Sequence, residues 1–171
     1  MQQRSVETGG APAMPAPQQY LTFLLGGEMF GLGILGIKEI IEYRLPTEVP
    51  MMPPALRGVI NLRGAVVPVM DVQLRFGRSA SAITKRSCIV IVEIARAGEQ
   101  QVLGLLVDAV SEVVEIAPAD IADAPSFGAG IHRDFIHGMA KRDERFVILL
   151  DADAVLANDA PAQLPDAALA A

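Results

Sequence analysis

The sequence has little of the chemistry on which enzymes and metal proteins depend. Its 171 residues include one cysteine, two histidines and no tryptophan. Cys88 cannot form an internal disulfide, and its place in an apolar run indicates a buried, reduced thiol. His132 and His137 have no cysteine or third histidine nearby to complete a zinc site. The sequence therefore predicts no metal site and no cofactor.

Motifs for catalysis, nucleic-acid binding and membrane insertion are also missing. No Gly-x-Ser-x-Gly motif occurs, and Gly31 and Gly33 lack the strand–turn–helix context of a phosphate loop. The net charge of -6 argues against a nucleic-acid surface. No apolar run approaches the roughly 20 residues that span a bilayer, and the first residues lack a secretion signal. We expect a soluble, cytoplasmic protein with no catalytic residues.

The chain does contain enough apolar residues, 51% of the total, to form a sizeable core. Residues 1–17 are rich in Gly, Ala, Pro and Gln and are expected to form a flexible tail, as are residues 158–171. The sequence thus predicts one folded region over residues 18–157.

The stretch Leu56–Phe76 carries the clearest pattern in this region. The prolines before it predict a short helix that ends at Gly58. Two apolar strands should then flank a tight turn at Arg63-Gly64, and the second strand should be buried on both faces. Pro68 places that strand at an edge or a bulge. Asp71 is expected to cap a short helix.

Two segments of the chain repeat. Phe30–Ile41 aligns with Leu103–Val114, and Leu56–Phe76 aligns with Ile136–Leu156. We therefore expect two copies of one unit, about residues 20–76 and 88–156, each with about five short strands. So few strands favour a small barrel in each copy, with a groove between the two barrels.

Charge differs between the two copies at one turn, where Arg63 aligns with Asp143. An arginine on a rigid turn can bind a partner's carboxylate or backbone carbonyls, although a solvated turn arginine is the simpler interpretation. Phe127, in a Gly- and Ala-rich connection, has two similar interpretations. It either fills the core or anchors an interface.

Several motifs together resemble the CheW family, the coupling proteins of bacterial chemotaxis. They are FGLGILGIKEI from Phe30, LRGVINLRG from Leu56, VVPVMD from Val66, LGLLVDAVSEV from Leu103 and APSF from Ala124. The resemblance covers residues 20–156. It implies an all-β fold, with a few short helices, of two SH3-like five-stranded barrels packed side by side.

The resemblance also implies a non-enzymatic adaptor, monomeric outside a signalling array. Such an adaptor joins the cytoplasmic tips of methyl-accepting chemoreceptors to the regulatory domain of the histidine kinase CheA. The positions that match receptor coupling are Ile37, Gly58, Arg63, Gly104, Val110 and Val113. Glu39 and Phe127 match kinase contacts. Gly33 and Ser126 depart from the family pattern, which has acidic residues there.

Three alternatives remain at this stage. The chain could be a CheW paralogue in another array, such as one that controls pili or biofilm, or the adaptor domain of a CheV-type protein. It could also be an enzyme or small-molecule carrier, which a dry pocket with converging polar groups inside one barrel would favour. For the favoured adaptor, Ile37, Val110 and Val113 are expected to line a groove that accepts the apolar stripe of a receptor helix.

Overall fold

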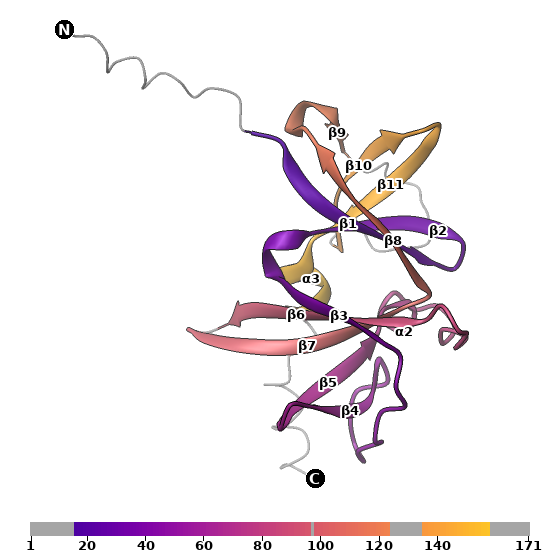
Figure 1. Cartoon of the computed structure of the whole chain (residues 1–171), viewed down its shortest axis with the longest axis vertical. Helices are drawn as coiled ribbons and strands as arrows, with labels where there is room; N and C mark the ends of the chain where they lie inside the picture. Colours follow the sequence, from indigo (N-terminus) through magenta and orange to yellow (C-terminus); the bar gives the residue numbers. More distant parts are fainter. Residues whose placement is uncertain (1–15, 97, 124–134, 158–171) are drawn as a thin grey trace, which may run out of the picture.

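The computed structural model describes residues 16–96, 98–123 and 135–157, which form two curved β-sheets with short helical turns (Figure 1). This confirms the predicted mostly β, CheW-like architecture. The predicted tails, apart from Ala16 and Pro17, lie outside the described residues, and so do Phe127 and His132.

The first sheet has six strands, in the order β8-β1-β2-β11-β10-β9. Their bounds are β1 Gln18–Leu25, β2 Glu28–Gly33, β8 Ala109–Ile116, β9 Ile121–Ala122, β10 Ile136–Arg142 and β11 Arg145–Leu150. All neighbours pair antiparallel except β11 and β2, which are parallel. A 3₁₀ helix, η2 (Pro118–Asp120), precedes β9, and helix α3 (Ala152–Ala157) follows β11.

The second sheet has five strands, in the order β3-β6-β7-β5-β4. Their bounds are β3 Ile37–Glu42, β4 Leu56–Leu62, β5 Ala65–Asp71, β6 Cys88–Arg96 and β7 Glu99–Val107. Here β5 and β7 are the parallel pair. A 3₁₀ helix, η1 (Ile34–Gly36), joins β2 to β3, and helix α2 (Val72–Arg75) follows β5.

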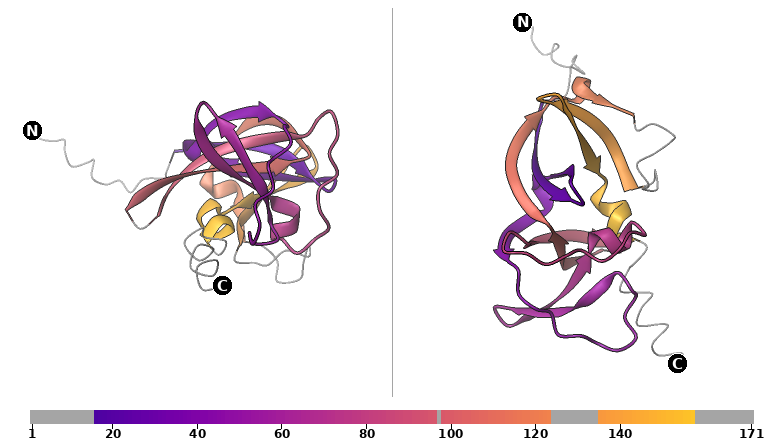
Figure 2. Two further views of the ribbon diagram at one scale, coloured as in Figure 1. Left: turned by 90° about the horizontal axis from the view of Figure 1, so that it is seen from below. Right: turned by 90° about the vertical axis from the view of Figure 1, so that its right-hand side faces the viewer.

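The two copies of the repeat exchange hairpins, a question that the sequence alone leaves open, so neither sheet is built from one copy. The β1–β2 hairpin of the first copy belongs to the sheet of β8–β11, and the β6–β7 hairpin of the second copy belongs to the sheet of β3–β5. Figures 1 and 2 show the indigo β1–β2 hairpin beside the orange and yellow strands. Each sheet therefore contains residues from both halves of the sequence.

The repeat itself is visible in the register of the two parallel strand pairs. Gly31 on β2 lies opposite Leu149 on β11, and Gly104 on β7 lies opposite Val69 on β5. These are the same two positions of the repeat, with the copies interchanged. The two sheets are thus built on the same strand register.

Most short-range predictions are confirmed. Gly26-Gly27 turns between β1 and β2, and Arg63-Gly64 turns between β4 and β5. The Asp71 carboxylate accepts hydrogen bonds from the first backbone N–H groups of α2, and Asp151 caps α3 through the Ala154 N–H. These features depend on neighbouring residues, which is why the sequence predicts them.

Two predictions for the central stretch are wrong, and the one for Pro68 is confirmed in part. Residues 50–55 form turns and not the predicted short helix; β4 already begins at Leu56, and Gly58 lies in it with a φ of 139°. Val66 is 72% exposed, so β5 is not buried on both faces along its whole length. Pro68 lies on an internal strand and not at the sheet edge, but the predicted irregularity is present beside it. The β4–β5 pairing shifts register between Leu56 and Gly58, and pairing with β7 begins only at Val69.

The largest apolar cluster contains residues of both sheets. Four phenylalanines from distant segments form a continuous ring contact within it: Phe23, Phe30, Phe76 and Phe135. A smaller cluster belongs to each sheet separately, one around Val147 and Leu149 and the other around Val67 and Val69. The two sheets therefore share one core, and each has an interior of its own.

Candidate functional site

Arg63 stands at the tip of the β4–β5 hairpin. Its φ of 51° and that of Gly64, 88°, define a tight turn, and the Gly64 N–H donates to Asn61 Oδ1 over 2.9 Å. The turn is short and places the arginine at the end of the hairpin. The side chain is 69% exposed.

Glu39 on β3 holds this guanidinium. Arg63 Nη1 and Nη2 donate to the two carboxylate oxygens over 2.6 and 2.7 Å, a bidentate pair. The hydrogen bond from Arg63 lowers the pKa of Glu39, and the same bond raises the pKa of Arg63. The pair stays charged through the neutral pH range.

This contact brings together two residues that the resemblance assigned to different partners, Arg63 to receptors and Glu39 to the kinase. Because β3 and β4 are opposite edges of their sheet, the pair also draws those edges toward each other. Two further contacts act in the same way. Arg44 Nη1 donates to the Asn61 carbonyl over 2.8 Å, and Thr47 pairs with Val59.

The three apolar residues of the expected groove differ in exposure. Ile37 and Val110 are partly buried and pack against the main core, where they lie opposite Val92 and Phe23 on the neighbouring strands. Val113 is 49% exposed. Val113 therefore offers a partner more accessible surface than the other two, and the groove itself stays a prediction.

Gly58 and Gly104 are buried and lie where the chain packs too closely for a side chain. A Cβ on Gly104 would stand 2.7 Å from Ile89 Cγ2, and one on Gly58 would collide with the Thr47 carbonyl. Their effect on a partner would therefore act through the packing of the second sheet.

The sequence analysis did not find two exposed apolar residues beside this site. Ile40, 42% exposed, follows Glu39, and Val66 lies opposite Asn61 on the hairpin that carries Arg63. The continuous apolar run of β5 concealed Val66, because such runs are typical of buried strands.

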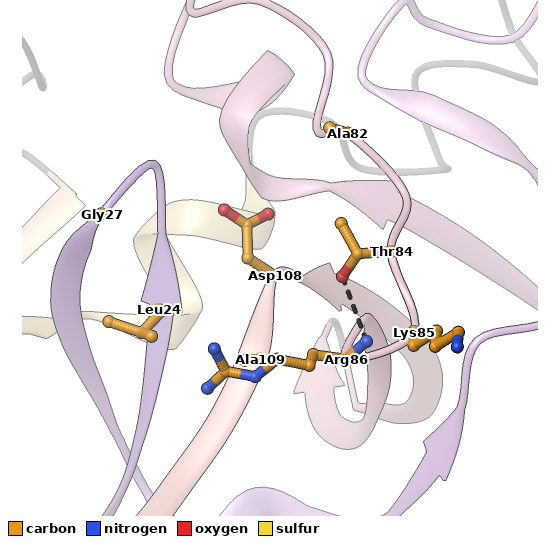
Figure 3. Close-up of a pocket in the computed structure, with 8 residues that line it drawn as sticks. All are labelled: Leu24, Gly27, Ala82, Thr84, Lys85, Arg86, Asp108 and Ala109. Carbon is orange, nitrogen blue, oxygen red and sulfur yellow. Dashed lines mark hydrogen bonds between the residues drawn. The ribbon is translucent and has the colours of Figure 1, made fainter.

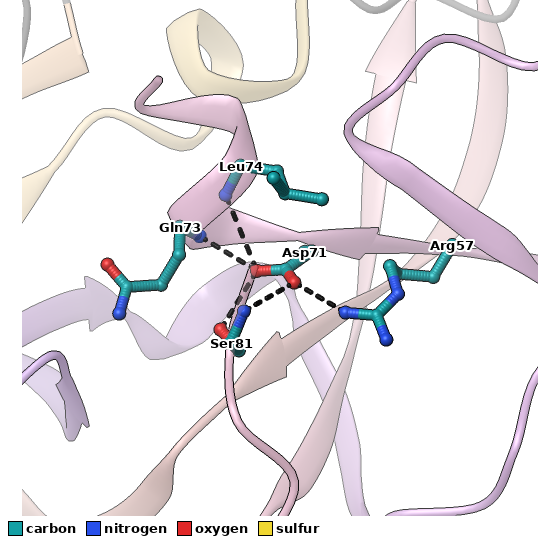
Figure 4. A network of polar contacts seen from close by, with 5 residues as sticks. All are labelled: Arg57, Asp71, Gln73, Leu74 and Ser81. Carbon is teal, nitrogen blue, oxygen red and sulfur yellow. Dashed lines mark hydrogen bonds and ion pairs between the residues drawn. The ribbon is translucent and has the colours of Figure 1, made fainter. Parts of the chain in front are cut away.

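A buried polar network joins β4 and β5 at the end of their hairpin away from the Arg63 turn (Figure 4). The Asp71 carboxylate, fully buried, accepts from Arg57 Nη1 at 2.7 Å and from Ser81 N and Oγ at 2.9 Å each, besides capping α2. Bonds from four residues compensate the burial of its charge. The network ties β4, β5 and the loop after α2 into one unit.

A cavity of about 610 Å³ lies where the two sheets meet (Figure 3). The β1–β2 turn, the loop at residues 82–86 and the β7–β8 junction line it, and Asp108 at that junction accepts from the Gly26 N–H over 2.8 Å. It lies between the sheets and has Lys85 and Arg86 at its wall, so it is not the dry barrel pocket that a carrier would need.

No group of three or more His, Cys, Asp or Glu side chains within residues 16–96, 98–123 and 135–157 is placed to hold a metal ion. None of the helices in these ranges has the length and apolar composition to cross a bilayer.

Comparison with known proteins gives consistent matches. The chemotaxis protein CheW of Rhizobium meliloti is 32% identical over 142 residues, covering 83% of this chain and 89% of the relative. CheW of Klebsiella aerogenes is 30% identical with 83% of each chain covered. Protein PilI of Pseudomonas aeruginosa is 26% identical and covers 81% of this chain and 79% of its own.

A solved structure has the same fold. The scaffolding protein TtCheW from Thermoanaerobacter tengcongensis superimposes with a TM-score of 0.71 at 37% identity, over 80% of this chain and 86% of its own. The family model described as the CheW-like domain matches residues 19–160. The exchanged two-sheet fold, the relatives and this match agree, and the chain belongs to the CheW family.

Proposed function

We propose that this protein is a non-enzymatic, cytoplasmic scaffold of chemotaxis signalling that couples chemoreceptor tips to the regulatory domain of a CheA-type kinase. The observation that carries the proposal is the exposed Arg63 guanidinium, held by Glu39 on a chain of the CheW family. Relatives named as chemotaxis proteins and as a scaffolding protein support the same role.

The ion pair prepares Arg63 for a partner. The guanidinium has five N–H donors, and the bond to Glu39 uses one from each terminal nitrogen. The remaining donors can bind carbonyl or carboxylate groups of a receptor hairpin. Because Glu39 already fixes the side chain, binding loses less conformational entropy than it would with a free arginine.

Other parts of the surface supply apolar contact. Val113 on the first sheet, and Ile40 and Val66 on the second, are exposed, and such residues suit the apolar stripe of a helix. Glu39 is bonded to Arg63, so we propose that the receptor and kinase contacts lie next to each other at this ion pair. Phe127 remains a proposed kinase contact outside the described residues.

The scaffold performs no chemical step in this proposal. Individual contacts can be weak because an array holds the partners at high effective concentration. Signalling then consists of a shift in the arrangement of the kinase domains.

The PilI match favours a second candidate, an adaptor in an array that controls pili. The two candidates share the fold and the site and differ only in the identity of receptor and kinase. A pull-down from the native cell, with the captured receptor and kinase identified, distinguishes them.

The test of the main proposal is a charge reversal at Arg63. We expect Arg63→Glu to fold normally, because the side chain is exposed, and to weaken co-sedimentation with a receptor cytoplasmic hairpin by about tenfold or more. Kinase activation in a reconstituted array should fall in parallel.

The matched control is the double variant Arg63→Glu/Glu39→Arg, which rebuilds the internal ion pair with the charges exchanged. If Arg63 contacts the receptor, the double variant stays defective. Full recovery of receptor binding would show that the pair serves only the fold, and would overturn the assignment of Arg63 to the receptor contact.

A further inference from the structure

The turn that carries Arg63 has a counterpart with the opposite charge. In the first copy of the repeat, the turn residues Arg63 and Gly64 have φ values of 51° and 88°; in the second, Asp143 and Glu144 have 49° and 71°. Glu39 on β3 corresponds to Glu112 on β8. Where the second sheet has the Arg63–Glu39 ion pair, the first sheet thus has two carboxylates.

A cavity of about 180 Å³ lies at this place in the first sheet, and both Glu112 and Asp143 line it. Met29, Val114 and Val147 form an apolar wall, and Thr22 lies beside them. An engineered apolar cavity of about 150 Å³ admits benzene, so this one has room for the end of one long side chain.

The corresponding place in the second sheet is filled from within. Ile91 stands where the first sheet has Thr22, since both lie opposite the repeated glycine, and Ile91 is fully buried. Leu62 stands where the first sheet has Arg142, and it packs against the same apolar cluster as Ile91. In the first sheet, the smaller Thr22 and the charged Arg142 take the positions of Ile91 and Leu62. The first sheet therefore has a cavity where the second sheet is filled.

Backbone contacts hold Glu112 at the rim. The Thr22 hydroxyl donates to the Glu112 carbonyl over 2.7 Å and accepts from the Glu112 N–H over 3.1 Å, across an irregularity in the β1–β8 pairing. The carboxylate makes no ion pair within the described residues, and neither does that of Asp143.

We propose that this cavity receives an arginine side chain from a partner protein, whose guanidinium takes the position that Arg63 has in the other sheet. The methylene groups would contact the apolar wall, and the carboxylate of Glu112 would accept from the guanidinium as Glu39 does. Asp143 stands at the repeat position of Arg63, so its carboxylate would be a second acceptor for the partner's guanidinium. The inference rests on the proposed function only for the partner's identity.

The chain's own arginines at the rim define the competing occupant. Arg142 and Arg145 line the cavity and lie opposite each other as a cross-strand pair, where like charges repel. Neither makes an ion pair within the described part of the chain. If Arg142 filled the cavity itself, no partner arginine would be needed, and the experiment must separate these cases.

A titration of the full-length, ¹⁵N-labelled protein with Nα-acetyl-arginine amide tests the cavity directly. We expect saturable amide shifts at Thr22, Glu112 and Asp143. Nα-acetyl-citrulline amide has nearly the same shape without the charge and should shift none of them. Equal shifts with both compounds, or no saturable shift, would overturn the proposal.

Variants connect the shifts to the carboxylates. Glu112→Gln should weaken binding of the arginine amide about three- to tenfold, whereas Glu115→Gln, an exposed change on the same strand, should leave it unchanged. Asp143→Arg should form an internal pair with Glu112 and abolish binding while the protein stays folded. Unaltered binding by Glu112→Gln would refute the site, as would binding seen only after Arg142→Leu.

A second experiment measures the binding of the wild-type protein and the same variants to a CheA-type regulatory domain. Loss of that binding in Glu112→Gln and Asp143→Arg, with Glu115→Gln unaffected, supports a kinase arginine as the occupant. Shifts with the arginine amide but no kinase binding by the wild-type protein would contradict the proposed function and leave the cavity assignment intact.

Discussion

At the residue scale, one position of the repeat differs between the two copies in its burial and in the number of hydrogen bonds it accepts. Asp71 and Asp151 both cap the helix that follows the last strand of their copy. Asp71 is fully buried and also binds Arg57 and Ser81, whereas Asp151 is exposed and accepts one capping bond of 3.1 Å. At this position the first copy therefore has a buried polar network, and the second copy has a single exposed cap.

A substitution at this position should accordingly cost far more in one copy than in the other. Asp71→Asn keeps the shape but leaves Arg57 without its charged partner, so we expect a loss of about 2–4 kcal/mol in the free energy of unfolding. Asp151→Asn, its matched control, should cost less than about 1 kcal/mol because asparagine caps helices well. Urea denaturation of both variants measures the difference, and equal losses would contradict this view of the network.

At the element scale, the sequence predicts what neighbouring residues determine. Gly26-Gly27 and Arg63-Gly64 are confirmed as turns, and the caps at Asp71 and Asp151 are confirmed, because each depends on a few local bonds. The exchange of hairpins was not predictable in this way. Strands rich in Val and Ile fit many neighbours equally well, so their composition does not say which sheet they join.

The Arg63 site likewise has one feature that depends on neighbouring residues and another that depends on residues far apart in the sequence. That Arg63 lies on a tight turn follows from the sequence, but its bond to Glu39 does not. The two residues approach because the fold of the second sheet brings the β4–β5 turn within hydrogen-bond distance of β3. Gly58 and Gly104 illustrate the converse, since motif similarity assigned them to receptor coupling and the structure places them in close packing.

Glycine substitutions test whether these positions act through packing. Gly104→Ala should destabilise the protein by about 1–3 kcal/mol, because the new methyl group meets Ile89 on the neighbouring strand. Gly33→Ala is the control, because a Cβ there meets nothing within 4 Å and it should be neutral. Urea midpoints and receptor co-sedimentation should fall together for Gly104→Ala. Wild-type stability combined with lost receptor binding would instead indicate direct contact.

At the scale of the whole molecule, the two sheets are interdependent. Each takes one hairpin from the other half of the sequence, and the largest apolar cluster contains residues of both. Two strand pairs join the halves within each sheet: β1–β8 and β2–β11 in the first, and β3–β6 and β5–β7 in the second. A partner that binds at Arg63 thus acts on a unit whose two sequence halves cannot separate without breaking strand pairs in both sheets.

Cutting the chain between the two copies should therefore leave the halves associated. A protease site inserted between Ala82 and Ile83, both exposed, should be cleaved, and the fragments 1–82 and 83–171 should co-elute and unfold in one transition. Produced alone, neither fragment should fold as a monomer, because β1–β2 would lack β8 and β11, while β6–β7 would lack β3 and β5. Size-exclusion chromatography and amide NMR spectra measure both outcomes. A dispersed spectrum from either isolated fragment at monomeric mass would mean that a half can build its own sheet, contrary to the exchanged architecture.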